Sequence, residues 1–175
     1  MEKIFIAGPG IEVAPFAAVN DAAELEHALA HIGRPWVLKT RRFGYDGKGQ
    51  VKIAPGSDLA EAHAAIGRFP AILEGFVSFV REVSVVAARG LDGSFAAFDV
   101  CENEHRDHIL AYTRIPAQLS PKTGEAAITA ARRIGDALGY IGVFAVEMFV
   151  VGEGAAERVI VNEIAPRVHN SGHWT

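Results

Sequence analysis

The sequence predicts an α+β protein with two lobes, a small α/β lobe over about 15–73 and a larger antiparallel-sheet lobe over 74–175. Half of the 175 residues are hydrophobic, so the chain can bury a substantial core. Strand-like and helix-like segments are mixed without the regular alternation of a doubly wound sheet. After residue 80, alternating segments divided by turn signals are typical of an antiparallel meander. Residues 1–14 are expected to connect to the lobes, and a ligand cleft is expected between the lobes.

Short helices and strands alternate in the expected small lobe. Asn20 or Asp21 can cap a first helix and Gly33 can end it, because Asn and Asp satisfy free N–H groups and glycine closes helices readily. Ser57 or Asp58 can begin a second helix. In chain order we expect an opening helix over 1–6, an extended piece over 13–16, a helix over 21–33, strands over 36–39 and 51–53, a helix over 57–67 and a strand over 71–76.

The expected large lobe contains three alternating segments, an alanine-rich helix and a final hairpin. Gly90 marks a turn after the first segment, and Gly139 ends the helix. The hairpin turns around residues 152–154. The expected elements are strands over 82–89, 95–102 and 108–116, a helix over 123–138 and strands over 142–151 and 158–164.

Composition argues against several classes of protein. A net charge of −4 is unlike that of a nucleic-acid binder, which is usually basic. No apolar run approaches the ~20 residues that span a bilayer, and the N-terminus does not look like a secretory leader. Cys101 is the single cysteine, which suits a reducing cytoplasm, and it is a poor candidate for a catalytic thiol. We therefore expect a cytoplasmic protein that binds neither nucleic-acid polymers nor membranes.

Two carboxylates stand in the otherwise apolar strands of the final hairpin. If Val151 opposes Arg158, Glu147 lies across from Asn162 and beside Glu163. Neighbouring carboxylates in an apolar sheet repel one another and lose hydration, unless a cation compensates. Mg²⁺ favours one or two carboxylates together with phosphate oxygens. The pair predicts a magnesium site, and the alternative is that either glutamate faces solvent.

A glycine-rich run follows the strand over 36–39. Glycine permits close backbone approach, so a loop over 44–50 with Lys39 and Lys48 nearby can bind phosphate groups. The loop lacks the order of a Walker-type motif. Asp46-Gly47 is also an ordinary turn dipeptide, so the segment could simply connect two strands.

Further polar candidates lie at a strand end and in the C-terminal tail. The backbone at 74–77 could border an adenine, and Glu82 could bind ribose hydroxyls or be a solvated acid beside Arg81. The tail over 165–175 is rich in hydrogen-bond donors, and Arg167 offers a fork suited to phosphate or carboxylate. His169 and His173 have the spacing of a zinc pair, but the residues between them disfavour a helix.

These residues, in this order, resemble those of 5-(carboxyamino)imidazole ribonucleotide synthases, the ATP-grasp ligases of bacterial and fungal purine biosynthesis. The resemblance is carried by Lys39, GYDGKGQ over 44–50, then Glu74, Glu82 and Glu147, and finally NEIAPRVHNSGHWT over 162–175. It covers essentially the whole chain. It implies an ATP-grasp fold, ATP and Mg²⁺ as cofactors, aminoimidazole ribonucleotide and bicarbonate as substrates, carboxyphosphate as an intermediate and a homodimer.

The resemblance also implies a role for each matching position. The implied ATP ligands are Lys39, Gly44, Tyr45, Asp46, Gly47, Lys48, Gly49, Gln50, Glu74, Gly75, Phe76, Val77, Glu82, His105, Asn162 and Glu163. Magnesium would be held by Glu147 and Glu163. The ribonucleotide and bicarbonate would meet Arg167, His169, Asn170 and Ser171. The implied catalytic residues are Tyr45, Lys48, Arg167 and His169.

The sequence departs from the family pattern in two ways. Family members carry further N-terminal and C-terminal domains that this chain does not include. Many other ATP-grasp enzymes place an asparagine two residues after the second metal glutamate, and here that position is Ala165. Two alternatives remain open at this point: a formate-dependent phosphoribosyl-amide ligase, and a fragment that binds nucleotide without catalysis.

Overall fold

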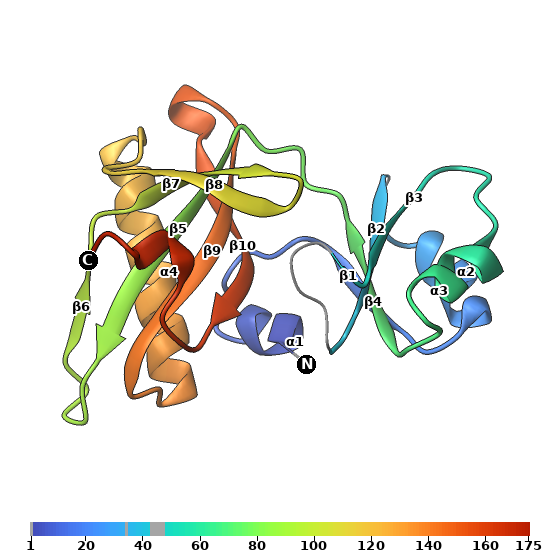
Figure 1. Ribbon diagram of the computed structural model, residues 1–175, viewed down its shortest axis with the longest axis horizontal. Helices are drawn as coiled ribbons and strands as arrows, with labels where there is room; N and C mark the ends of the chain where they lie inside the picture. The colour runs from blue at the N-terminus through green and yellow to red at the C-terminus, as the bar shows by residue number, and fades with distance from the viewer. Residues whose placement is uncertain (1, 34, 43–47) are drawn as a thin grey trace. The chain divides into compact units, whose positions relative to one another are not determined.

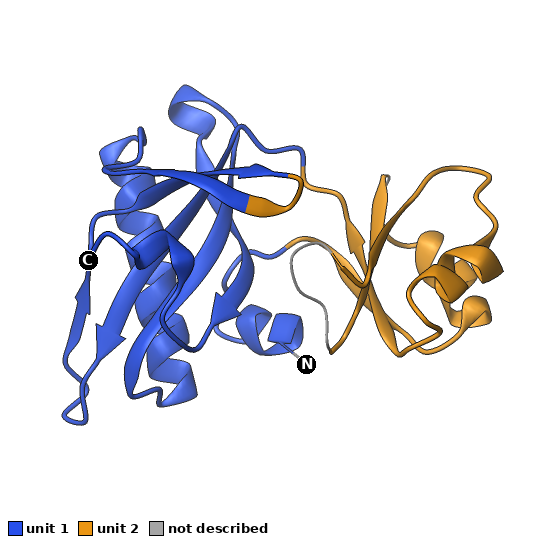
Figure 2. Cartoon of the chain, viewed as in Figure 1, with its two compact units in different colours: residues 1–13, 78–106, 110–175 blue, residues 14–77, 107–109 orange. Residues whose placement is uncertain are grey.

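The computed structural model describes residues 2–33, 35–42 and 48–175, and it divides into two compact units (Figures 1 and 2). The large unit contains the residues up to 13 with 78–106 and 110–175, and the small unit contains 14–77 and 107–109. The boundary therefore lies at 77/78, whereas the sequence placed it at 73/74. The opening residues, expected to be a connecting segment, pack into the large unit.

The small unit is a four-stranded antiparallel sheet with two helices. The strand order is β1 (Phe16–Val19), β4 (Ala71–Gly75), β2 (Trp36–Thr40) and β3 (Gln50–Ile53). Figure 1 shows α2 (Ala22–Leu29) and α3 (Leu59–Ala65) on the same side of this sheet. Leu25, Leu38 and Leu73 are completely buried in the core between them. The expected hairpin is confirmed, with Trp36 paired to Ile53.

Both helices of the small unit begin at a predicted aspartate. Asp21 accepts a hydrogen bond from Glu24 N, and Asp58 accepts from Ala60 N and Glu61 N. Each cap satisfies N–H groups that have no partner within the helix. The helix α2 ends at Leu29, earlier than the predicted Gly33, and the chain then turns into β2.

The large unit is a six-stranded sheet in the order β10-β9-β5-β7-β8, with β6 also paired to β5. Figure 1 shows α4 along one face of this sheet and the C-terminal segment against the other. Buried Ile134 of α4 lies in one core cluster with Val146 and Met148 of β9. The elements are α1 (Glu2–Ala7), β5 (Arg81–Arg89), β6 (Phe95–Ala97), β7 (Cys101–Arg106), β8 (Ile109–Arg114), α4 (Pro121–Leu138), β9 (Gly142–Val151), η1 (Gly154–Ala156), β10 (Arg158–Ala165) and η2 (Asn170–Gly172).

The long helix α4 is confirmed with both ends close to their predicted positions. Ser120 caps its start by accepting from Thr123 N, and Gly139 closes it in the left-handed conformation with φ +58°. No helix in the described part of the chain is long and apolar enough to cross a membrane.

One predicted strand is wrong, because the segment over 95–102 forms two strands. Ala97 pairs with Ala87, but Cys101 pairs with Ser84, so the register along β5 shifts by one residue between them. Residues 98–100 accommodate the extra residue as an irregular connection, with Phe98 N donating to Val86 O. The interruption lets β6 and β7 share the same edge of β5.

Candidate functional site

The two hairpin glutamates lie directly opposite one another in the sheet. From Arg158 to Val161 the pairing of β10 with β9 follows the predicted register. A bulge then intervenes, and Glu163 pairs with Glu147 itself. The prediction that Glu147 faces Asn162 is therefore wrong. Unbroken register would place Glu163 on the opposite face of the sheet from Glu147, and the bulge brings both side chains to one face.

The opening segment of the chain supports this bulge. Val161 N donates to Glu12 O at 2.9 Å, and Ile164 N donates to the Glu2 carboxylate at 2.6 Å. Val13 forms a parallel bridge with Val161. The bulge thus has hydrogen-bond partners on the outer side of β10, which fixes where the strand shifts.

The same face of the sheet gathers further polar side chains. The pairing places Glu82 opposite Phe149 and opposite Asn103, and Ser84 opposite Glu147. On β9 the intervening residues point the other way, into the core against α4. A small hollow on this polar face is lined by Glu82, Val83, Asn103, His105, Glu147, Met148, Phe149 and Asn162.

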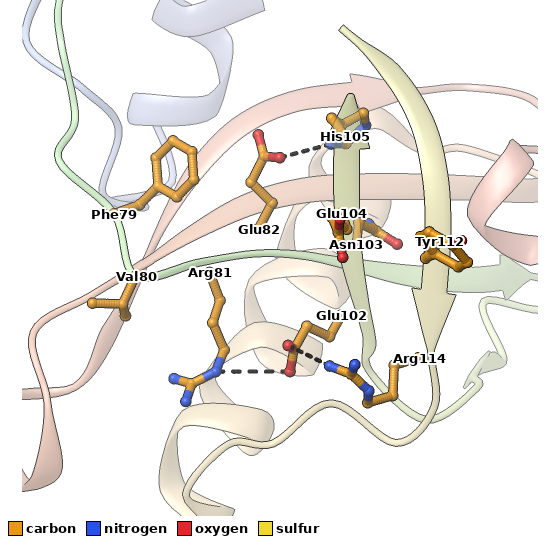
Figure 3. Close-up of a pocket in the computed structure, with 10 residues that line it drawn as sticks. All are labelled: Phe79, Val80, Arg81, Glu82, Glu102, Asn103, Glu104, His105, Tyr112 and Arg114. Carbon is orange, nitrogen blue, oxygen red and sulfur yellow. Dashed lines mark hydrogen bonds and ion pairs between the residues drawn. The ribbon is translucent and has the colours of Figure 1, made fainter. Parts of the chain in front are cut away.

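Glu82 and His105, which both line this hollow, form an ion pair (Figure 3). His105 Nδ1 lies 2.6 Å from a Glu82 carboxylate oxygen. The hydrogen bond to Glu82 raises the pKa of His105, burial opposes the increase, and the negative charges of Glu82, Glu147 and Glu163 add to it. The expected strands over 95–102 and 108–116 left His105 between them, and the structure places it on β7.

A pocket of about 350 Å³ opens next to this ion pair (Figure 3). Arg81 and Arg114 both contact Glu102 in its lining, at 3.7 and 3.0 Å. Phe79, another lining residue, stacks on Phe149 with ring centroids 4.7 Å apart. The pocket therefore combines a flat aromatic surface with charged side chains of both signs.

His169 lies behind Glu147. Its Nε2 is 2.7 Å from Glu147 Oε1, and its side chain is only 6% exposed. His169 Nδ1 is 2.9 Å from the Ser171 hydroxyl, which is itself completely buried. The tail residues expected to meet substrate thus divide into two groups. Arg167 and Asn170 are exposed, whereas the polar atoms of His169 and Ser171 are bonded within the protein.

In the small unit, Lys39 and Glu74 form an ion pair at 2.8 Å, with the Glu74 side chain 7% exposed. The N–H groups of Gly75 and Phe76 donate to Pro15 O and Pro35 O, so these two donors are already used. Phe76 is partly exposed, with the Lys52 ammonium 5.6 Å from its ring centre. Gln50 pairs with Lys39 at the start of β3. The expected phosphate-loop residues Gly44, Tyr45, Asp46 and Gly47 lie outside the described residues, whereas Lys48 and Gly49 lie within them.

The carboxylate pair fits the requirements of a magnesium ion. Glu147 and Glu163 are directly opposite, so their Cα atoms are about 4.5–5.5 Å apart. Among the described residues there is no group of three or more His, Cys, Asp or Glu side chains that could hold a metal ion by themselves. Two carboxylates completed by phosphate oxygens and water suit Mg²⁺, which rarely binds in a cage made only of protein ligands.

Three residues of this face escaped the sequence analysis. Ser84 and Phe149 stand within predicted strands, whereas Asn103 lies one residue beyond the predicted strand over 95–102, and none of the three belongs to a recognisable motif. For Ser84 and Phe149 the available signal was their spacing of two residues from Glu82 and Glu147, because residues two apart in a strand share a face. Cys101 behaves as expected of an inert thiol, since its burial raises its pKa.

Known proteins resemble this chain closely. The ATP-grasp domain family matches residues 5–175. The N5-carboxyaminoimidazole ribonucleotide synthase of Brucella melitensis biotype 1 is 52% identical over 176 residues, covering 99% of this chain and 48% of that protein. The enzyme of the same name from Bacillus subtilis strain 168 is 40% identical over 174 residues, covering 99% of this chain and 45% of its own length. The chain thus spans about half the length of these curated relatives.

Solved structures agree with the sequence comparisons. An ADP complex of N5-carboxyaminoimidazole ribonucleotide synthetase superposes with a TM-score of 0.90 at 39% identity, covering 99% of this chain and 45% of that one. An Aspergillus clavatus N5-carboxyaminoimidazole synthase in complex with ADP and 5-aminoimidazole ribonucleotide gives 0.85 at 27% identity, covering 98% and 44%. The family resemblance inferred from the motifs is confirmed, and the chain belongs to the ATP-grasp family.

Proposed function

We propose that this chain is the ATP-binding part of an enzyme that carboxylates aminoimidazole ribonucleotide on its exocyclic amine, using ATP and bicarbonate. The observation that carries the proposal is the bulge that sets Glu163 directly opposite Glu147 on the polar face of the large sheet. Two facing carboxylates suit Mg²⁺ bound to a nucleoside triphosphate. Relatives at 52% and 40% identity bear the name of this activity, and a related structure contains ADP with the ribonucleotide.

In this proposal a bicarbonate oxygen attacks the γ-phosphorus of ATP and ADP leaves, giving carboxyphosphate. The carboxyl group then passes to the exocyclic amine, with loss of phosphate and a proton. Such phosphoryl transfer depends mainly on positioning and on neutralising charge. Bound magnesium would supply positive charge to the phosphate oxygens, with Glu147 and Glu163 as its protein ligands.

The other residues keep the roles given by the resemblance, adjusted to their surroundings. Glu82 accepts hydrogen bonds from the ribose hydroxyls, and His105 holds its carboxylate in place at 2.6 Å. Exposed Arg167 and Asn170 bind the ribonucleotide and bicarbonate, whereas His169 acts on the site through Glu147. Lys39 contacts ATP phosphates from the small unit. We further propose that the enzyme works in the cytoplasm as a homodimer.

Calorimetric titration of Mg·ATP into the 175-residue chain tests the nucleotide site. We expect measurable binding, and a loss of affinity of about tenfold or more in Glu163→Gln, because that variant removes one of two carboxylate ligands. The matched control is Glu153→Gln, which changes an exposed glutamate in the turn of the same hairpin. A flat titration of the unaltered chain, or equal affinity in both variants, would contradict the proposal.

Release of ADP tests the reaction itself. We expect release that depends on both bicarbonate and aminoimidazole ribonucleotide, and its loss in Glu163→Ala. Formate in place of bicarbonate should not support turnover. Turnover with formate would identify the chain as part of a formate-dependent ligase of the same superfamily.

A further inference from the structure

A continuous network of buried hydrogen bonds ends at Glu147. It runs from Asn103 through Ser84, Ser171 and His169 to the Glu147 carboxylate, and we call it the Asn103–Glu147 network. Asn103 Nδ2 donates to Ser84 Oγ at 2.9 Å, and Ser84 Oγ donates to Ser171 Oγ at 2.7 Å. The last two links join the Ser171 hydroxyl to His169 Nδ1 and His169 Nε2 to Glu147 Oε1. They measure 2.9 and 2.7 Å.

The network is almost entirely shielded from water. Ser84 and Ser171 are 0% exposed, Asn103 is 6% and His169 is 7% exposed. Three separate parts of the large unit supply these residues: β5, β7 and the tail around η2. A buried polar group without a partner destabilises the folded state by about 1–3 kcal/mol, so we expect all the hydrogen bonds of the network to be formed at the same time.

The hydrogen bonds of the network all point in one direction. Thr113 donates to Asn103 Oδ1 at 3.2 Å, which leaves the Asn103 amide nitrogen to donate towards Ser84. Each serine hydroxyl accepts one hydrogen bond and donates its own hydrogen to the next residue of the network. The Ser171 hydroxyl therefore donates to His169 Nδ1.

A second contact requires the same arrangement at His169. The backbone N–H of Ser171 also donates to His169 Nδ1, at 3.4 Å. A ring nitrogen that accepts hydrogen bonds carries no proton, so the proton of the neutral ring lies on Nε2. That Nε2–H group then donates to Glu147 Oε1, which orients the carboxylate.

We infer that Asn103, Ser84 and Ser171 are positioning residues, which fix the tautomer of His169 and through it the orientation of the Glu147 carboxylate. With Oε1 held by His169, the other oxygen of Glu147 is directed to the metal. Groups that bond to metal ligands in this way typically change metal affinity by about 10–100-fold. The inference rests on the proposed function only where it makes Glu147 a magnesium ligand.

Nitrogen-15 NMR of the histidine rings tests the tautomer without any metal or nucleotide. The signals of His169 are identified by their disappearance in His169→Gln. In the unaltered chain we expect Nδ1 without a proton and Nε2 with one. The opposite tautomer would overturn the inference, whatever the chain proves to bind.

The isosteric variant Asn103→Asp tests the direction of the network. An aspartate carboxylate accepts where the asparagine amide donates, so Ser84 and then Ser171 must reverse, and Nδ1 of His169 must carry a proton. We expect the Nδ1 signal to change accordingly. Gln118→Glu is the control, because it makes the same amide-to-carboxylate change at an exposed position of the large unit. An unchanged Nδ1 signal in Asn103→Asp would overturn the inference.

Binding of Mn²⁺ with ADP, followed by electron paramagnetic resonance, tests the consequence for the metal. Ser84→Ala should weaken Mn²⁺ binding by about tenfold. The control Ser94→Ala changes an exposed serine in the same unit and should leave it unchanged. Equal affinity in Ser84→Ala and the unaltered chain would overturn the inference. Failure of the unaltered chain to bind Mn²⁺·ADP would instead contradict the proposed function. The NMR experiment would still decide the tautomer of His169, because it needs neither metal nor nucleotide.

Discussion

At the scale of single residues, the pair of His105 and Glu82 couples folding to pH. Its hydrogen bond and charge raise the pKa of His105 above the ordinary value of 6.5, against the effect of burial. The folded protein therefore holds the His105 proton more tightly than the unfolded chain does. This stabilisation is fully present below the pKa that His105 has in the unfolded chain. It is lost as the pH rises through the higher pKa that His105 has in the folded protein.

Replacing His105 by glutamine should therefore destabilise the protein more in mild acid than in mild alkali. The free energy of unfolding, measured by urea denaturation at about pH 6 and about pH 8.5, should show a larger difference between variant and unaltered chain at the lower pH. His27→Gln, at an exposed position of α2, is the control. An equal loss at both pH values would show that the ion pair does not link folding to protonation.

The identity of the principal acids could be read from the sequence, but their surroundings could not. Glu147 and Glu163 stood out because carboxylates are rare in apolar strands. The resemblance implied that His169 meets substrate, and nothing in the tail indicated that Glu147 would lie 2.7 Å from it. Ser171 was expected at the same surface, yet it is completely buried. Both positions follow from contacts between residues far apart in the chain, which local patterns do not encode.

At the scale of elements, two glycines of α4 have opposite surroundings. A Cβ atom added at Gly124, near the start of the helix, would meet no atom within 4 Å. At Gly135 it would lie 2.8 Å from the ring of Phe144. Phe144 is 1% exposed and packed against the ring of Tyr140, so it has little room to move. Gly135 therefore permits the close approach of α4 to β9.

Alanine at these two positions should change stability in opposite directions. Gly124→Ala should raise the free energy of unfolding by about 0.5–1 kcal/mol, because alanine loses less backbone freedom in a helix. Gly135→Ala gains the same helical preference, but overpacking against Phe144 should outweigh it and lower stability by about 1–2 kcal/mol. Thermal unfolding of both variants measures the difference, and stabilisation by Gly135→Ala would contradict the close packing described for α4.

Elements with local signals were predicted well, and irregular strands were not. Asp21, Asp58 and Ser120 cap helices through side-chain groups only a few residues from their partners. The break at 98–100 and the bulge before Glu163 instead depend on which strand lies alongside. A bulge shifts the strand pairing by one residue, and no particular residue type marks its position in a sequence. The hydrogen-bond partners of the bulge in β10, Glu2 and Glu12, lie about 150 positions earlier in the sequence.

At the scale of the whole molecule, each unit has a hydrophobic core of its own. Leu38 and Leu73 belong to the cluster of the small unit, and Met148 and Ile134 belong to that of the large unit. The two clusters share no residue among those described. A separate core is what allows a unit to open independently of its neighbour in the chain.

Truncating one core should therefore loosen one unit more than the other. Leu73→Ala and Met148→Ala each remove a buried side chain, at 0% and 1% exposure, and each should cost about 2–5 kcal/mol within its own unit. Hydrogen exchange measured amide by amide should show faster exchange in β2 and β4 for Leu73→Ala, with β5 and β9 nearly unchanged. Met148→Ala should give the reverse pattern. An equal loss of protection in both units would mean that they unfold as one cooperative body. In that case a destabilised core in either unit would raise the exchange rate of the protected amides in both units.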